Sequence, residues 1–220
     1  VELKDWDALE ELLPELKRHK VIDSAQLQSL SRTVHIKLLN QSAVGDEEEG
    51  VEFLRKRWQK MPADMKRDPE ILHNYVGLLN QQQVYDLSAK TILTALKQAW
   101  DPVLVKLYGY VEAQNSALQL SNAESWLPQH ATDPQLLLCL GRLSARESLW
   151  GKARDYFESS YRLERSAEVC AELGRLLIAL GEPKVAAAYF REGLLMRETG
   201  LPALPMPEKM VPHSKLLARS

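Results

Sequence analysis

The stretch LGRLSARESLWGKARDYF, residues 140–157, recurs in outline as LGRLLIALGEPKVAAAYF, residues 173–190. Both stretches begin with LGRL, and the interval between them is 33 residues (173 − 140). In each, an alanine follows twelve residues after the glycine and a phenylalanine follows sixteen after it. A period in this range is typical of stacked helical hairpins, each too small to bury its apolar face alone. The pattern therefore predicts an all-α solenoid and directs the search for function to its surface.

Helix-start signals keep this spacing over much of the chain. Asp68, Asp101 and Asp133 each precede a proline, which places a capping carboxylate before a residue whose missing N–H costs nothing in the first helical turn. Ser166 continues the series. A glycine and, twelve residues later, a small residue follow each cap, and we interpret them as a close approach of the two helices: Gly77 with Ala89, Gly109 with Ser121, Gly141 with Ala153, and Gly174 with Ala186. These signals predict repeat units at residues 68–98, 101–130, 133–163 and 166–197.

The flanking segments are less regular. Residues 1–20 are expected to form a half repeat in which Pro14 kinks or shortens the helix. Residues 23–63 are expected to form an atypical hairpin, opened by a capping-box pattern of Asp23 and Gln26. Residues 1–200 thus form one helical repeat domain. The proline-rich tail at residues 201–220 is expected to be extended or disordered, and its apolar content leaves a groove-bound position open.

Composition excludes several classes of protein. The chain has 220 residues, 45% of them hydrophobic and 26% charged, with a net charge of −2. The balance argues against a nucleic-acid partner, which usually meets a strongly basic domain. No apolar run of about 18 residues is present to span a membrane. Because the chain starts with valine in mid-repeat, we expect it to be a piece of a longer protein, and a membrane anchor in the upstream part is left open.

Residues that could support catalysis or metal binding are scattered. The five histidines lack ligand spacing, and no glycine-rich phosphate loop is present, so neither a metal, a cofactor nor an enzyme activity is expected. Cys139 and Cys170 lie at analogous places in neighbouring repeats. They are predicted to be buried free thiols, and the alternative is a disulfide or thiol chemistry.

Charged runs and tryptophans each allow two interpretations. The acidic run at residues 46–49 and the basic residues 55–57 and Lys60 complement the dipole of one helix, and the alternative is a binding surface. The five tryptophans, most of them in or beside second helices, are expected to pack between hairpins. The alternative for them is an exposed aromatic platform for a planar ligand.

The spacing of Leu137, Leu140, Gly141, Ala153 and Phe157 resembles the tetratricopeptide repeat (TPR), whose hairpins form a right-handed superhelix. More specifically, DPQLLLCLGRLSARESLWGKARDYFESSYRL (residues 133–163) resembles the C-terminal part of the HemY family. The segments at residues 5–20, 58–71 and 101–109 are similar to that family too, so the likeness covers most of residues 5–196.

This resemblance implies a TPR domain attached to the bacterial inner membrane and associated with late haem (protohaem IX) biosynthesis. The expected role is a non-catalytic scaffold, on the cytoplasmic side, for partner proteins that include enzymes of that pathway. The family has no established catalytic residues to transfer. The alternative is a haem or porphyrin carrier or sensor, in which a His, Tyr or Cys would be the axial ligand.

Applying the TPR register also predicts which first-helix residues face the concave groove: Asn74, Leu78, Lys106, Tyr110, Leu138, Arg142, Ala171 and Arg175. Lys106, Arg142 and Arg175 would form a basic ladder that receives carboxylates of a peptide or of a porphyrin, because arginine offers planar, bidentate donors. The alternative is that these cations are solvated or paired with neighbours such as Glu172 and Glu147.

Overall fold

The computed structural model describes residues 5–19, 22–43 and 47–198. Over these residues the chain forms twelve α-helices and one short 3-10 helix, and no strand. In chain order the helices are α1 (Trp6–His19), α2 (Ser24–Ser42), α3 (Glu47–Lys60), η1 (Met65–Arg67), α4 (Pro69–Gln81), α5 (Tyr85–Leu96), α6 (Pro102–Tyr108), α7 (Ser116–Glu124), α8 (Leu127–His130), α9 (Pro134–Arg146), α10 (Trp150–Leu163), α11 (Ala167–Ala179) and α12 (Pro183–Arg197). The predicted tail at 201–220 lies outside the described residues.

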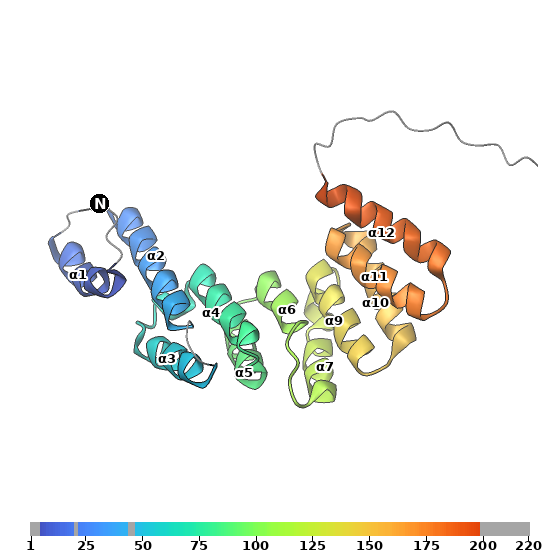
Figure 1. Cartoon of the computed structure of the whole chain (residues 1–220), viewed down its shortest axis with the longest axis horizontal. Helices are drawn as coiled ribbons and strands as arrows, with labels where there is room; N and C mark the ends of the chain where they lie inside the picture. Colours follow the sequence, from blue (N-terminus) through green and yellow to red (C-terminus); the bar gives the residue numbers. More distant parts are fainter. Residues whose placement is uncertain (1–4, 20–21, 44–46, 199–220) are drawn as a thin grey trace, which may run out of the picture.

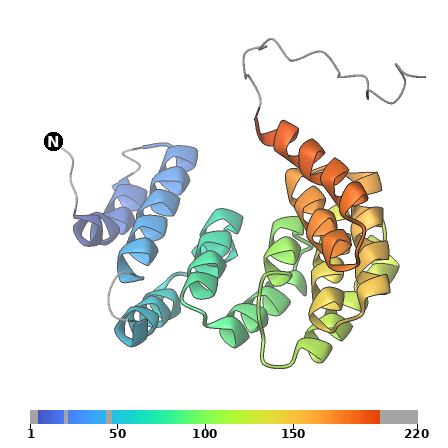
Figure 2. The ribbon, with the colours of Figure 1, turned by 45° about the vertical axis from the view of Figure 1, so that its right-hand side comes forward.

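The helices stack into an arc (Figures 1 and 2). The pairs α2–α3, α4–α5, α9–α10 and α11–α12 pack as hairpins, and α1 packs against α2. The first helices α2, α4, α6 and α9 also pack in succession on one another, which makes the array continuous. This arrangement is an all-α solenoid of TPR-type hairpins, as the repeat pattern predicts.

The predicted helix caps are confirmed. The carboxylates of Asp68, Asp101 and Asp133 each accept hydrogen bonds from two backbone N–H groups of the following helix, and the Ser166 hydroxyl accepts one from Val169. Each cap therefore satisfies donors that have no partner within the helix itself.

The capping aspartates have a second role that the spacing alone did not reveal. Asp68 Oδ2 lies 2.8 Å from Nη2 of Arg32, Asp101 Oδ2 lies 2.6 Å from Nε2 of His73, and Trp100 Nε1 donates to Asp133 Oδ2 at 2.7 Å. In every case the partner belongs to an earlier part of the array. One side chain thus starts a helix and ties it to an earlier part of the array.

The repeated glycines do different things in different units. An ideal Cβ on Gly141 would lie 2.3 Å from Cδ1 of Phe157, and one on Gly174 would lie 2.6 Å from Cε1 of Phe190, so both glycines make room for an aromatic ring of the second helix. The expectation of a close approach is wrong for Gly77, whose Cβ would meet no atom within 4 Å. The unit that starts at Asp68 has Leu93 where the later units have phenylalanine.

The unit at 101–130 departs most from the prediction. Helix α6 ends at Tyr108, so Gly109 is its C-cap and not an interior residue. Helices α6 and α7 both pack mainly on α9. The expected contact of Gly109 with Ser121 is wrong: Ser121 is exposed, and Ala123 is buried instead. An ideal Cβ on Gly109 would lie 3.0 Å from Cα of Cys139, so this glycine lets α9 approach the end of α6.

Side chains compensate for the early end of α6. Gln119 Nε2 donates to the carbonyl oxygens of Tyr108 at 2.8 Å and Val111 at 3.0 Å. Arg146 donates to the carbonyl oxygens of Val111 at 2.6 Å and Gly109 at 3.2 Å. Because an unpaired carbonyl in a packed region is costly, these two side chains allow the irregular segment between α6 and α7.

Pro14 lies inside the leading helix α1, which continues to His19, so the proline does not end the helix there. Pro14 itself is exposed. Arg57 of α3 forms ion pairs with Asp7 and Glu10 of α1. Arg57 therefore joins two helices, in addition to the predicted effect of its charge on the dipole of α3. Most of the acidic run at residues 46–49, the other half of that prediction, has side chains that lie outside the described residues.

The apolar core runs along the array and contains most of the tryptophans. Trp58 stacks on Tyr75 with ring centroids 3.9 Å apart, and Trp100 packs edge-on against Trp126 at 5.7 Å. Trp6 packs against the α1–α2 cluster. Trp150 is the exception, because it is 48% exposed. Packing between helices, the first interpretation of the tryptophans, holds for the other four.

Candidate interaction surface

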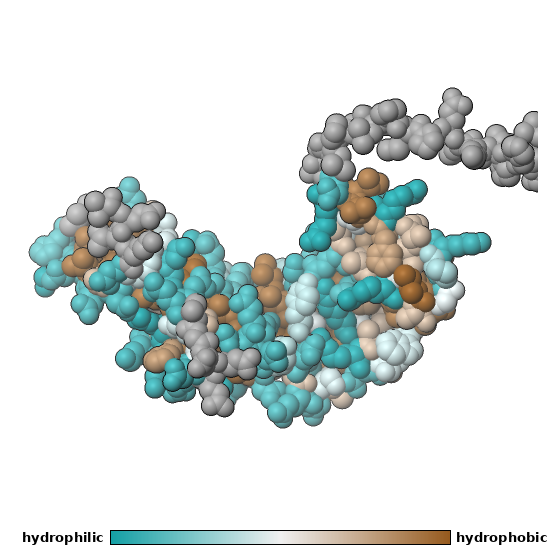
Figure 3. Space-filling view, in the orientation of Figure 1, coloured by the Kyte–Doolittle hydropathy of each residue, from teal (hydrophilic) through white to brown (hydrophobic). Residues whose placement is uncertain are grey.

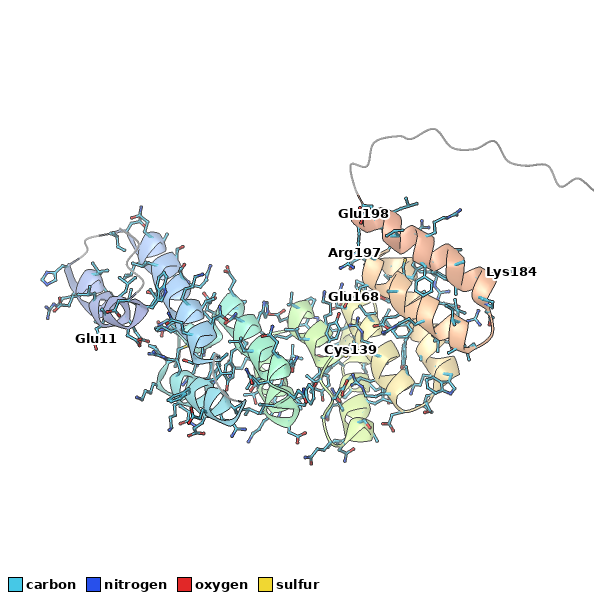
Figure 4. The ribbon with its side chains drawn as sticks, in the orientation of Figure 1. Glu11, Cys139, Glu168, Lys184, Arg197 and Glu198 are labelled. Carbon is cyan, nitrogen blue, oxygen red and sulfur yellow. The ribbon has the colours of Figure 1, made fainter. Side chains whose placement is uncertain are left out.

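The first helices carry a charged cluster on the inner side of the arc. Side chains of α6, of the segment just after it, of α9 and of α11 meet there: Lys106, Tyr110, Arg142, Glu168 and Glu172. Figure 4 shows Glu168 on the side of α11 that faces α6 and α9. The space-filling view shows the molecule hollowed between its N-terminal half and the α11–α12 hairpin, with hydrophilic and hydrophobic residues side by side (Figure 3).

Arg142 is the centre of this cluster. Its Nη2 lies 2.6 Å from Glu168 Oε1, its Nε lies 2.9 Å from Glu172 Oε1, and its guanidinium carbon lies 4.0 Å from the centroid of the Tyr110 ring. The residue is only 8% exposed. Pairing and stacking of this kind suit a buried arginine, because its charge is met by two separate carboxylates and its flat face by an aromatic ring.

Glu168 joins three hairpins. Lys106 Nζ lies 3.1 Å from its Oε2, and the Tyr110 hydroxyl donates to Oε1, so α11 contacts α6 although a whole hairpin separates them in the chain. Such a contact requires strong local curvature of the array. The cluster therefore stiffens the inner face at this point.

The three cations of the expected basic ladder thus form ion pairs with neighbouring carboxylates, which is the second of the two interpretations given above. Glu172 pairs with both Arg142 and Arg175, while Glu147 forms no ion pair among the described residues. Three cations face two carboxylates, so the local excess is one positive charge. Arg175, 71% exposed at its side chain, is the cation most accessible to a partner. The role of these residues in binding stays a prediction.

Asn74 lies apart from the cluster. Its Nδ2 donates to Oδ1 of Asn40 at 3.1 Å and ties α4 to α2. Leu78, expected to face the groove, is 8% exposed and packs in the core between α2, α3 and α4. Sequence reasoning also missed Glu168. Its signal was the spacing of Glu168, Glu172 and Arg175, which puts all three on one face of α11.

Hydrogen bonding changes the acidity of the cluster. Burial alone would raise the pKa of Glu168, but hydrogen bonds from Tyr110, Arg142 and Lys106 and the charge of Arg142 outweigh it and hold the pKa at about 2. The pKa of Tyr110 is raised, first by burial and then by its hydrogen bond to Glu168. At neutral pH the cluster therefore contains an ionised Glu168.

This shift predicts a specific acid sensitivity. A carboxyl with a depressed pKa stabilises the fold above its unfolded pKa and loses that contribution as the pH falls toward its folded value. For Glu168 the window runs from about pH 4.5 down to about 2. Across this window we expect the free energy of unfolding of the wild type to fall by on the order of 2 kcal/mol more than that of Glu168→Gln.

Urea midpoints at pH 7 and pH 3 measure that difference, and Asp155→Asn removes an exposed carboxylate as the control. Glu168→Gln should lower the midpoint at pH 7 and have a much smaller effect at pH 3. An equal effect at both values would mean that Glu168 carries no depressed pKa.

Among the described residues, the two cysteines and the side chains that could bind a metal are not gathered into one site. Cys139 and Cys170 are buried free thiols, as predicted, and burial raises the pKa of Cys139 to about 12. A thiol in that state is a poor nucleophile. Within residues 5–198 as described, no group of three histidine, cysteine or acidic side chains is arranged to hold a metal ion.

Apolar side chains lie exposed beside the cluster. Val103 of α6 is 46% exposed and Ile178 of α11 is 54% exposed. Val103 shares its helix face with Lys106, and Ile178 shares one with Arg175, because the two residues of each pair are spaced three apart. The inner face therefore combines apolar contacts with paired charges. Over the described residues, none of the helices is long and apolar enough to cross a membrane.

No model of a known protein family matches the chain, and no curated protein matches it. Among solved structures, MamA (residues 41 to the end) from Desulfovibrio magneticus RS-1 is 19% identical, covers 76% of this chain and 98% of its own, and has a TM-score of 0.48. PilF from Pseudomonas aeruginosa is 20% identical, covers 89% of this chain and 93% of its own, and has a TM-score of 0.46. The helices and packing of the chain itself establish it as an all-α solenoid of TPR-type hairpins.

Proposed function

We propose that the chain is a non-catalytic scaffold that binds a protein partner along the inner face of its arc. The observation that supports this is the exposed apolar pair Val103 and Ile178 beside the charged cluster on the first helices. Exposed apolar side chains next to ordered charges are typical of surfaces that bind other proteins. The cluster makes the face rigid, so binding would cost little ordering of the surface itself.

In its finer form, we propose that the chain is the repeat domain of a HemY-like protein. It would hold enzymes of late haem biosynthesis beside the bacterial inner membrane, from the cytoplasmic side and through an upstream anchor. The sequence resemblance over residues 133–163 supports this assignment. The accessible Arg175 would receive an acidic side chain or a C-terminal carboxylate of the partner.

Affinity capture from bacterial membranes tests the proposal with matched variants. Val103→Ser with Ile178→Ser removes apolar contacts from the inner face, whereas Phe53→Ser with Leu118→Ser removes equally exposed apolar side chains from α3 and α7. We expect the first pair to lower recovery of the partner about tenfold and the second pair to leave it unchanged. Equal recovery with all three proteins would place the binding surface elsewhere.

The identity of the captured protein tests the finer proposal. Recovery of ferrochelatase or another late enzyme of the pathway supports it, and partners from unrelated processes contradict it. Titration with haemin distinguishes the alternative, direct tetrapyrrole binding. A Soret band that one histidine, tyrosine or cysteine substitution abolishes would favour a carrier or sensor over the scaffold.

A further inference from the structure

A pocket of about 660 Å³ opens in the N-terminal half, and none of its lining residues belongs to the charged cluster. It lies between the end of α3, the segment around η1, the start of α4, one face of the second helix α5 and the start of α6. Its floor includes the buried side chains of Leu72 and Leu104. A pocket of this volume with an apolar floor is typical of a small-molecule site.

Two tryptophans line the pocket, and each is already fixed by another ring. Trp58 is stacked on Tyr75 with an interplanar angle of 1°, and Trp100 is stacked on His130 with centroids 3.6 Å apart. Trp100 is further held by its hydrogen bond to Asp133. Because both rings are held in place before any ligand arrives, they offer flat apolar surface with little loss of side-chain freedom on binding.

Three cations also line the pocket. They are Lys66, Arg67 and Lys90, and among the described residues none of the three forms an ion pair. The carboxylate that also lines it, Asp101, is already engaged by His73 and by the backbone of α6. Apolar walls with unpaired cations at their edge complement a molecule that is apolar at one end and anionic at the other.

We propose that this pocket binds a planar aromatic acid, whose rings lie against Trp58 and Trp100 and whose acid group meets the cations. Flat rings are favoured over an acyl chain because the tryptophans present fixed, flat surfaces that reward stacking. Arg67 and Lys90, both exposed at the pocket, would contact the acid group. This site is separate from the protein-binding face and does not depend on it.

Titration with 1-pyrenecarboxylate tests the proposal, because bound pyrene accepts energy from nearby tryptophans. We expect saturable binding that quenches tryptophan emission, and the quenching should persist in Trp150→Phe, which removes an exposed ring outside the pocket. Thr94→Trp places an indole at the exposed α5 position that lines the pocket and should abolish binding while helicity is unchanged. No saturable binding by the wild type would overturn the proposal.

The charge requirement has its own matched pair. Arg67→Gln with Lys90→Gln should raise the dissociation constant for 1-pyrenecarboxylate about tenfold. Arg55→Gln with Lys97→Gln should leave it unchanged, because these two exposed cations, one on α3 and one at the C-terminal end of α5, do not line the pocket. Equal affinity for uncharged 1-pyrenemethanol, or tighter binding of dodecanoate than of the aromatic acid, would also overturn the proposal.

Discussion

Replacing Gly141 with alanine is expected to destabilise the protein by about 2 kcal/mol, whereas Gly77→Ala is expected to stabilise it by about 0.5–1 kcal/mol. Both glycines lie inside first helices. The added Cβ at position 141 would lie 2.3 Å from Cδ1 of Phe157, a ring that is 2% exposed and has no room to move. At position 77 the same methyl group meets no atom within 4 Å, so only the gain in helix propensity remains.

Urea denaturation followed by helical circular dichroism measures both effects. Gly174→Ala is a graded control, because Phe190 lies 2.6 Å from the built Cβ but is 37% exposed and able to swing aside. We expect the change in the free energy of unfolding for Gly174→Ala to lie between the changes for Gly141→Ala and Gly77→Ala. Shifts of the same sign and size for Gly77 and Gly141 would show that the glycines act through helix propensity and not through the aromatic ring.

Removing the Arg142 side chain is expected to have the largest effect of any single change, a loss of roughly 3–5 kcal/mol for Arg142→Ala. The arginine is 8% exposed and faces both Glu168 and Glu172, so its loss leaves two carboxylates close together without their cation. Arg175→Ala is the matched control. Its side chain is 71% exposed, and exposed ion pairs contribute about 0–1 kcal/mol.

A rescue experiment separates charge from packing. Arg142→Met keeps much of the side-chain volume, and adding Glu168→Gln and Glu172→Gln to it removes the uncompensated charges. We expect the triple variant to recover most of the stability that Arg142→Met loses, measured as the urea midpoint at pH 7. Additive losses in the triple variant would mean that the cluster stabilises the fold through packing and hydrogen bonds and not through charge.

Local signals in the sequence identified the helices well, because their causes lie within a few residues. A cap such as Asp133 bonds to N–H groups two and three residues further along, and the proline after it needs no donor. The helix starts at Asp68, Asp101, Asp133 and Ser166 could therefore be predicted from the residues alone. So could the burial of the two cysteines, since each lies on an apolar helix face.

The early end of α6 could not be predicted in this way. It depends on Gln119 of α7 and Arg146 of α9, whose side chains donate hydrogen bonds to backbone carbonyl oxygens near Gly109. Those donors become available only when the helices pack. The repeat pattern, which treats every unit alike, has no means of showing that one unit replaces helical hydrogen bonds with side-chain ones.

The period of the chain by itself determined an array of helical hairpins, because the hairpins follow from regular spacing along one helix after another. The tertiary structure alone decided which charges meet on the inner face of that array. Glu168 contacts Lys106 and Tyr110 across 62 and 58 positions of the chain. Whether such residues touch depends on the curvature summed over several hairpins, a quantity that no local spacing contains, and for that reason the predicted row of free cations became a paired cluster.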